Sequence, residues 1–460
     1  MVVGAGPAGM AAALEAANAG LSVSLVDEDR RLGGQYYRGS DAVAGSGAPT
    51  WFAAGPRLRV RLETAVVDAQ SPTQLTTWSP EQGVGDLRCD GLVLATGAID
   101  RPCPLPGWTT PGVLTAGGAL TLAKSHFVPP GRRVVLSGSG PFLLPVAAAM
   151  LAAGASVTVL EATPLLASVR GLPALLRDRS TLRQAAGYFL ALGRDGCRIE
   201  YARGVTAIGG ESRVKWAEIS SLDGDWRPIS GTSRRVEADA VVLGYGFVPR
   251  VDLASLVGCR LATDASSMTQ HVAVDGHGRS SLQGVYAAGE AVGVAGSRIA
   301  QLEGRIAGLT AALDLGVLSP SSHARRVAQI RHRFVAPARS ARWISDAFHP
   351  RAGLFERASM DTVICRCEEV TRADVERLAT AATAGAPTAR GIKLLTRAGM
   401  GLCQGRMCAP TLLAWASRSQ RGLDRVQRDG APAWTPRPPI RPVPFTGLGA
   451  LPESESRGRP

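Results

Sequence analysis

Two stretches of the chain share the same order of apolar strand, glycine-rich turn, apolar helix and second apolar strand. In the first stretch, residues 1–3 and 21–26 have the pattern of strands, and an Ala-rich helix lies between them. In the second, residues 133–136 and 157–160 have the strand pattern and residues 146–153 the helical one. Units of this kind build doubly wound sheets, so the pattern predicts an α/β protein with two Rossmann-like domains.

The first glycine turn has the spacing of a dinucleotide-binding motif and reads Gly4-Ala5-Gly6-Pro7-Ala8-Gly9. Gly4 would make the tight turn, Gly6 would let the backbone approach a pyrophosphate, and Gly9 would let helix and strand pack closely. The N-terminus of the following helix would direct free N–H groups and positive dipole charge to the phosphates. Asp27 ends the second strand and would accept hydrogen bonds from an adenosine ribose. The sequence therefore predicts a bound dinucleotide at this turn.

The second glycine turn, Gly138-Ser139-Gly140, departs from this motif. Glu161 ends the following strand and suits the ribose of NAD. Leu143, however, stands where the third glycine belongs, and Pro145 removes a backbone N–H early in the helix. Two interpretations remain open: NAD or an adenine nucleotide binds at this turn, or the unit is a scaffold that no longer binds a nicotinamide nucleotide.

Composition and charge suit a large enzyme. The 460 residues, 45% of them hydrophobic and 19% charged, predict two to four domains with ample cores. No apolar run is long enough for a transmembrane segment, and no signal peptide is visible. Arginine carries nearly all of the +13 net charge, but no nucleic-acid-binding motif accompanies it, so we expect no nucleic-acid partner. Only three residues precede Gly4, so the first strand is short or the natural start lies upstream.

Four of the eight cysteines crowd into one short segment with the spacing C-x-C, 35 residues, C-x4-C: Cys365, Cys367, Cys403 and Cys408. Two close pairs of thiolates suit a [2Fe–2S] cluster, because each of its two irons needs two sulfurs. Zinc is an alternative, although its sites favour pairs spaced C-x2–4-C, and free thiols are another. The other cysteines are scattered and no C-x-x-C occurs, which predicts a reducing, cytoplasmic location.

Residues 1–316 resemble the two-dinucleotide-binding flavoprotein oxidoreductases. The matching motifs are the first glycine turn, Ala95-Thr96-Gly97 after an apolar strand, and the pair Gly289-Glu290. The resemblance implies FAD at the first turn, with Thr96 and Gly97 beside it and the acid after Gly289 reaching the ribityl chain. Most relatives have Asp where this chain has Glu290, whose longer side chain can still accept that hydrogen bond. A helix-capping role for Glu290 is the alternative.

The cysteine segment resembles the bacterioferritin-associated-ferredoxin-like (BFD-like) [2Fe–2S] domain, and nearly the whole chain resembles one group of flavoproteins. The motifs that carry this likeness are Gly33-Gly34-Gln35, Gly138-Ser139-Gly140-Pro141, Glu303-Gly304-Arg305, Cys365-Arg366-Cys367-Glu368 and Cys403-Gln404-Gly405-Arg406 with Cys408. The group comprises the FAD-binding A or alpha subunits of opine dehydrogenases, hydroxyproline dehydrogenases and hydrogen cyanide synthase. The resemblance implies that Gly34 and Gln35 also contact FAD, and that a separate oxidase-like flavoprotein subunit oxidises an amine or imino acid while this chain passes the electrons onward.

These patterns divide the chain into six segments. In order they are residues 1–107 (FAD-binding domain, first part), 108–241 (NAD(P)-binding-like Rossmann domain), 242–316 (FAD-binding domain, second part), 317–360 (basic, irregular connector), 361–421 (small helical [2Fe–2S] domain) and 422–460 (extended tail rich in Pro and Arg). Because the tail needs something to pack against, we expect a partner to cover it together with the connector.

Two functions remain open at this point. In one, the chain is the electron-transfer subunit of a hetero-oligomeric dehydrogenase for an amine or imino acid. In the other, it is a free-standing reductase in which NAD(P)H binds at Gly138–Gly140 and reduces an acceptor through FAD. A regulatory iron–sulfur sensor would need a DNA-binding element, which the sequence lacks. No separate substrate domain is visible between the FAD halves, and this favours the first function.

Overall fold

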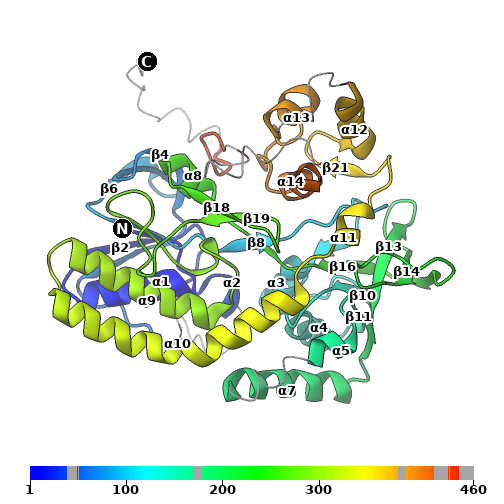
Figure 1. Cartoon of the computed structure of the whole chain (residues 1–460), viewed down its shortest axis with the longest axis horizontal. Helices are drawn as coiled ribbons and strands as arrows, with labels where there is room; N and C mark the ends of the chain where they lie inside the picture. The colour runs from blue at the N-terminus through cyan, green and yellow to red at the C-terminus, as the bar shows by residue number, and fades with distance from the viewer. Residues whose placement is uncertain are drawn as a thin grey trace.

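The computed structural model of the chain describes residues 1–38, 49, 51–169, 178–381, 389–418, 434 and 436–444. In Figure 1 a first α/β domain lies on the left, a second lies on the lower right, and the cysteine-containing segment forms a small domain above the second. The predicted fold class, two Rossmann-like domains followed by a small helical domain, is confirmed.

The first domain is built on a five-stranded parallel sheet in the order β20-β7-β1-β2-β3. Its strands are β1 (Val2–Val3), β2 (Val23–Val26), β3 (Leu58–Arg61), β7 (Leu92–Leu94) and β20 (Val285–Ala287). Because β20 comes from a segment far along the chain, the domain is discontinuous. Helices α1 (Pro7–Asn18) and α9 (Ser297–Asp314) pack closely, since a Cβ at Gly304 of α9 would lie 2.1 Å from the Ala8 carbonyl oxygen.

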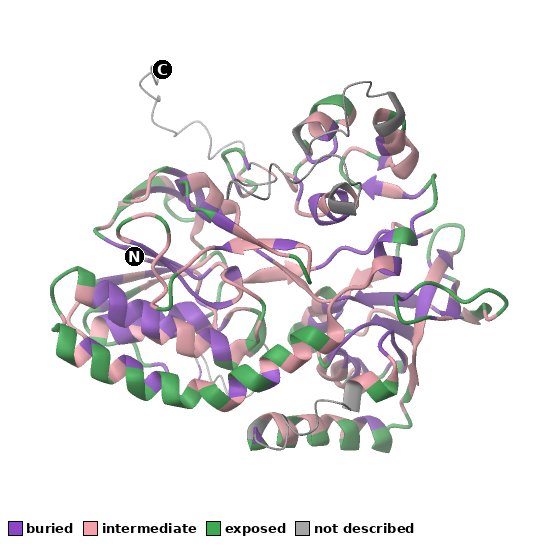
Figure 2. Ribbon diagram, in the orientation of Figure 1, coloured by how far each residue is buried: buried purple, intermediate pink, exposed green. Residues whose placement is uncertain are grey.

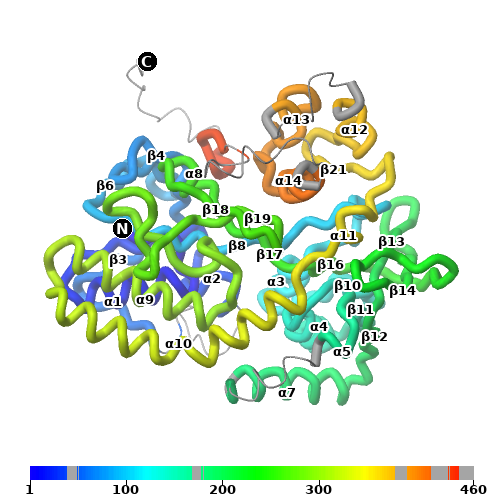
Figure 3. Tube along the Cα trace, viewed as in Figure 1, coloured from blue at the N-terminus to red at the C-terminus, as the bar shows by residue number. Residues whose placement is uncertain are grey.

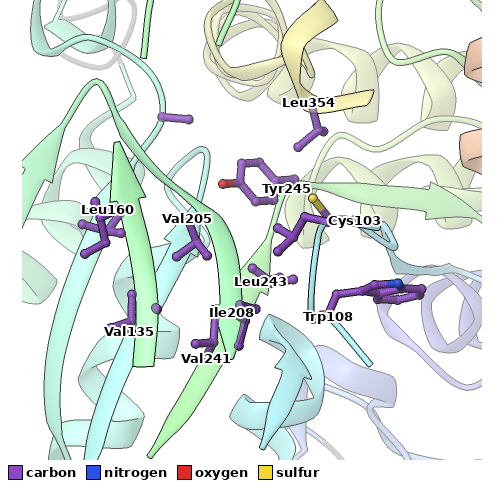
Figure 4. Packing of buried hydrophobic residues seen from close by; sticks show 14 of the residues in the cluster. Cys103, Trp108, Val135, Leu160, Val205, Ile208, Val241, Leu243, Tyr245 and Leu354 are labelled. Carbon is purple, nitrogen blue, oxygen red and sulfur yellow. The ribbon is translucent and has the colours of Figure 1, made fainter. Parts of the chain in front are cut away.

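The second domain contains another five-stranded parallel sheet, in the order β12-β11-β10-β16-β9. Its strands are β9 (Val113–Thr115), β10 (Arg133–Gly138), β11 (Ser156–Glu161), β12 (Arg198–Tyr201) and β16 (Ala240–Gly244). Helices α3 (Ala116–His126), α4 (Leu143–Ala152), α5 (Leu165–Val169) and α7 (Arg179–Arg194) accompany it, with an antiparallel sheet of β13 (Arg203–Gly209), β14 (Trp216–Ser221) and β15 (Arg234–Glu237). Figure 4 shows Val135 and Val241 of the parallel sheet in one buried cluster with Val205 and Ile208 of β13.

Shorter elements connect and flank the two domains. They are α2 (Gly34–Tyr37), β4 (Ala65–Ser71), β5 (Gln74–Ser79), β6 (Gly83–Arg88), β8 (Ala98–Asp100), β17 (Phe247–Pro249), α8 (Asp252–Val257), β18 (Leu261–Asp264), β19 (Thr269–Val272) and the 3₁₀ turn η1 (Gly289–Ala291). β8 leaves the first domain and β17 returns to it, and the two strands pair in antiparallel fashion. This pairing therefore joins the two segments in which the chain passes from one domain to the other.

The segment expected to be an irregular connector is instead the long helix α10 (Pro320–Phe348), so that expectation was wrong. Ser319 caps the helix, because its Oγ accepts a hydrogen bond from the backbone N–H of Ser322 at 3.3 Å. Val327 and Ile330, one turn apart, pack in a buried cluster with apolar residues of α9. Most of the arginines of α10 lie on its exposed face, where Figure 2 shows much green, but Arg326 is half-buried and pairs with Glu15 of α1.

The cysteine-containing domain follows the short helix α11 (Ala352–Glu356). It consists of β21 (Val363–Cys365), β22 (Val370–Thr371), α12 (Arg372–Ala381), α13 (Ala389–Thr396) and α14 (Ala409–Arg418). Two indole N–H groups attach it to the rest of the chain. Trp108 Nε1 donates to the Val363 carbonyl at 2.6 Å, and Trp415 Nε1 donates to the Phe355 carbonyl at 2.7 Å.

Candidate functional site

A cleft of about 970 Å³ lies between the two Rossmann-like domains and the C-terminal part of α10. Both glycine turns line it, from Gly4 to Ala8 in the first domain and from Ser139 to Phe142 in the second. Figure 3 shows α10 running from beneath α9 towards the second domain, which places its last turn at this cleft. The sequence analysis therefore found both turns, but it missed the helix that lies between them.

The first glycine turn has the geometry that its spacing predicts. Gly4 has a φ of +103°, and a Cβ there would lie 2.2 Å from the Ala95 carbonyl oxygen. A Cβ at Gly9 would lie 1.7 Å from the Gly4 carbonyl oxygen, so helix and strand pack without room for a side chain. A Cβ at Gly6, in contrast, would have no described atom within 4 Å, and the residue faces the cleft. The turn therefore leaves open the place where a pyrophosphate could approach the backbone.

Asp27 lies beside the turn at the end of β2. Its carboxylate accepts hydrogen bonds from the backbone N–H groups of Ala5 and Asp29, the latter at 2.8 Å, and burial raises its pKa. Gly34, with a φ of +56°, packs against the turn, since a Cβ there would lie 2.9 Å from Gly6 Cα. Gln35 follows it along the cleft. These residues surround one end of the cleft and could hold the adenosine part of a dinucleotide.

Of the residues expected at the flavin end of the site, Thr96, Gly97 and Glu290 line the same cleft. Thr96 Oγ1 donates to the Arg250 carbonyl at 2.6 Å, and Gly97, with a φ of +73°, is open to the cleft. Gly289 has a φ of +75° and packs against Ala8 of α1, where a Cβ would lie 2.6 Å from the Ala8 Cβ. The structure thus brings Thr96, Gly97 and Gly289 next to the first glycine turn.

Glu290 lines the cleft and has a carboxyl neighbour that the sequence analysis did not identify. The Gly289 backbone N–H donates to Glu303 Oε2 at 3.0 Å. Burial raises the pKa of Glu290 to about 7, and burial together with the Glu290 charge raises that of Glu303 to about 7. The N-cap of α9 is Gly296, so Glu290 does not cap that helix. The Glu303-Gly304-Arg305 motif was the only sequence signal for the second carboxyl group.

The second glycine turn is occupied by groups of the chain itself. The Gly140 backbone N–H donates to Glu161 Oε2 at 2.8 Å. Glu161 Oε1 accepts from the Thr163 backbone N–H at 2.8 Å, and burial raises the Glu161 pKa to about 7. The Phe348 side chain lies 3.4 Å from the position of a Cβ at Gly140. Asp27 makes similar hydrogen bonds at the first turn, so the Phe348 ring against Gly140 is what distinguishes the second turn.

The four cysteines form two pairs of neighbouring thiols, Cys365 with Cys408 and Cys367 with Cys403. The Cys408 thiol and backbone N–H groups that include that of Gly399 point to the Cys365 sulfur and lower its pKa to about 5. Among the described residues, no three possible metal ligands meet at one point. Two pairs with N–H groups directed at sulfur fit a [2Fe–2S] cluster, whose irons each bind two thiolates, better than one four-coordinate zinc ion.

The two pairs differ in exposure. Cys365 and Cys408 are 1% and 0% exposed, whereas Cys367 is exposed and Cys403 is partly exposed. Leu402, next to Cys403, is 75% exposed. A cluster held here would have one iron facing the protein interior and the other facing the surface.

A strap, residues 436–444 of the tail, connects the cysteine loop to the cleft. The side chain of Gln404 donates to the Pro439 carbonyl at 2.8 Å, and that of Arg406 donates to the Ile440 carbonyl. The Ile440 backbone N–H donates to the Val67 carbonyl in the first domain at 2.8 Å. The described residues of the strap therefore pack on their own chain and do not need a partner to pack against, while their coverage by a partner stays a prediction.

Fold and site together define a flavin-dependent oxidoreductase with an iron–sulfur domain. Residues 1–316 match the family described as pyridine nucleotide-disulphide oxidoreductase, and the chain belongs to this family. Residues 363–414 match the BFD-like [2Fe–2S] binding domain. FAD and a [2Fe–2S] cluster are therefore its cofactors, and no helix among the described residues is long and apolar enough to cross a membrane.

Two relatives match almost the whole chain. It is 32% identical to the A subunit of opine oxidase from Rhizobium meliloti over 99% of this chain and 88% of the relative. It is 33% identical to the HcnB subunit of hydrogen cyanide synthase from Pseudomonas protegens over 97% of each chain. The predicted group is thereby confirmed. The solved structure of L-proline dehydrogenase from P. horikoshii shares the fold, with a TM-score of 0.64 and 20% identity over 97% of this chain and 78% of that chain.

Proposed function

We propose that this protein is the electron-transfer subunit of a hetero-oligomeric dehydrogenase that oxidises an amine or imino acid on a separate oxidase-like flavoprotein subunit. The relatives that match the whole chain are named as subunits of an opine oxidase and of hydrogen cyanide synthase. On this proposal the chain receives electrons from the partner and passes them to an acceptor.

The observation that carries the proposal is the Phe348 ring at the second glycine turn. A free-standing reductase would need NAD(P)H at this turn, yet the ring lies against Gly140, and no described aromatic ring lies against Gly6 of the first turn. A nucleotide would therefore have to displace Phe348 at the end of α10 in order to reach the turn. On this proposal the electrons enter from another protein and not as hydride from a nicotinamide.

The residues of the first turn would hold FAD. Gly6 leaves its backbone open to the pyrophosphate, Asp27 would accept the ribose hydroxyls, and Glu290 would accept a ribityl hydroxyl. The family chemistry needs a two-electron flavin and a one-electron cluster, which together convert electron pairs into single electrons. Glu290 and Glu303, both with a pKa near 7, can hold a proton beside the flavin site at neutral pH.

The outer cysteine pair is the side of the cluster through which we propose exchange with another protein. Cys367 is exposed, as is Leu402 next to Cys403, while the inner pair is buried in the domain core. Exposed apolar side chains around a redox centre suit a protein-protein contact. A subunit that exchanges electrons with another protein needs a cluster with one exposed side of this kind.

Co-expression with a separate oxidase-like subunit tests the proposal. The purified complex should reduce a dye when given an opine, hydroxyproline or glycine, and a complex with Cys403→Ser should do so at least tenfold more slowly. Cys197→Ser, which changes a cysteine of the second domain outside the cluster segment, is the matched control and should leave the rate unchanged. Dye reduction by the isolated chain with any of these substrates would refute the subunit function.

A further inference from the structure

Trp434, from the C-terminal tail, lies against both glycine-containing turns of the cluster loop. A Cβ at Gly399 would lie 2.1 Å from Trp434 Cζ2, and a Cβ at Gly405 would lie 2.3 Å from Trp434 Nε1. Both glycines have positive φ, +78° and +89°. The loop therefore has no side chain at either place, and the indole ring fills the space that such side chains would occupy.

These two turns carry the groups that hold the cluster. The Gly399 backbone N–H points to the Cys365 sulfur, and Gly405 lies in the chain between Cys403 and Cys408. Lys393 Nζ lies 5.6 Å from the centroid of the Trp434 ring, a cation–π contact that helps to fix the ring. The adjacent strap is tied to the same loop, because the Arg437 backbone N–H donates to Gln404 Oε1 at 2.9 Å.

The indole N–H itself has no acceptor among the described residues, although it is buried. Leaving a buried donor unpaired costs about 1–3 kcal/mol, so such a group is rarely left without a partner. A cluster held by this loop would bring sulfur atoms, which are hydrogen-bond acceptors, to the loop on which the indole packs. Hydrogen bonds to cluster sulfur stabilise the more negative, reduced form and raise the reduction potential.

We propose that Trp434 closes over the [2Fe–2S] site and donates its Nε1–H to a sulfur of the cluster, so that the C-terminal tail forms part of the redox centre. The proposal concerns the cofactor alone and holds whichever protein supplies the electrons. It gives the tail a role in setting the potential at which the chain accepts an electron.

The test compares Trp434→Phe, which keeps an aromatic ring but removes the donor, with Trp415→Phe in the full-length protein. Trp415 lies near the same domain core, but its Nε1 already donates to Phe355. In a redox titration followed by EPR, Trp434→Phe should lower the ratio of reduced to oxidised cluster at a fixed potential by up to about tenfold, or 59 mV for one electron. Trp415→Phe should leave the ratio unchanged, and an equal potential in both variants would overturn the proposal.

A second measurement keeps Trp434 in place and so does not require Trp434→Phe to assemble a cluster. The protein is labelled with tryptophan that carries ¹⁵N only at the indole nitrogen, and the reduced cluster is examined by pulsed EPR. A ¹⁵N coupling that persists in Trp415→Phe supports the hydrogen bond. Absence of any ¹⁵N coupling in the fully loaded protein would overturn it.

Discussion

Arg441 and Glu28 form an ion pair at 2.8 Å between the last described segment of the chain and the acid that follows Asp27 in the first domain. Arg250 contacts the same carboxylate at 3.0 Å, and Arg406 of the cysteine loop binds Asp252 at 2.8 Å. Arg441 and Ile440 line the cleft themselves. The strap therefore connects the proposed adenosine end of the flavin site to the cluster loop.

Because of this connection, we expect Arg441→Met to weaken FAD binding two- to fivefold, as loss of a partly buried ion pair worth about 0.5–1 kcal/mol predicts. The dissociation constant of the apoprotein, measured by quenching of flavin fluorescence, checks this expectation. Arg30→Met is the control, since Arg30 pairs with Glu63 on the exposed surface with 86% of its side chain accessible. Equal affinities in both variants would contradict the role given to the strap.

Gly6→Val should abolish FAD binding without unfolding the protein. A Cβ at Gly6 would have no described atom within 4 Å, so the valine side chain would project into the space proposed for the pyrophosphate. Gly187→Val on α7 is the matched control, because a Cβ there also meets no described atom. Flavin absorbance after purification and the melting temperature of the apoprotein are measured. A Gly6→Val protein that keeps its full flavin content would rule out this site.

NADH should leave the flavin oxidised for many seconds under anaerobic conditions. The reason is the second turn, where the Phe348 ring packs against Gly140 and would have to be displaced by a nucleotide. Stopped-flow absorbance at the flavin maximum follows the reaction, with dithionite as the positive control. Bleaching within milliseconds would reveal a working hydride-donor site and favour the free-standing reductase.

The apoprotein should lose stability as the pH rises from about 5 towards 7. Glu303 has a pKa raised from 4.5 to about 7 in the folded state, so the folded form binds a proton that the unfolded form has already released in this window. Each such group removes up to about 1.4 kcal/mol per pH unit. Glu303→Gln, which can still accept the Gly289 hydrogen bond, should flatten the melting temperature against pH. Glu81→Gln on the exposed surface should not, and identical pH profiles for the two variants would contradict this assignment.

Local spacing was enough to predict the first glycine turn and the four cysteines, because the residues that form each motif lie close together in the sequence. The state of the second turn could not be predicted in this way. Phe348, which packs against Gly140, lies more than 200 positions further along the chain, and no local pattern connects the two residues. The helix α10 was missed for another reason. Its arginine-rich exposed face hid the signal of Ser319-Pro320 followed by Val327 and Ile330, which together indicate a capped helix with one buried side.

The long helix α10 has a mechanical consequence. Its first half is attached to α9 of the first domain through the cluster around Val327, while its end at Phe348 touches the glycine turn of the second domain. At 1.5 Å per residue its 29 residues span about 43 Å, and Pro337 inside the helix removes one backbone hydrogen bond and makes this the place where the helix bends most easily. Helix α10 thus contacts both Rossmann-like domains, which are also joined by the paired strands β8 and β17 and by the ion pair of Arg298 with Asp178. A rearrangement of one domain relative to the other would therefore have to bend α10, most easily at Pro337, or detach one of its ends.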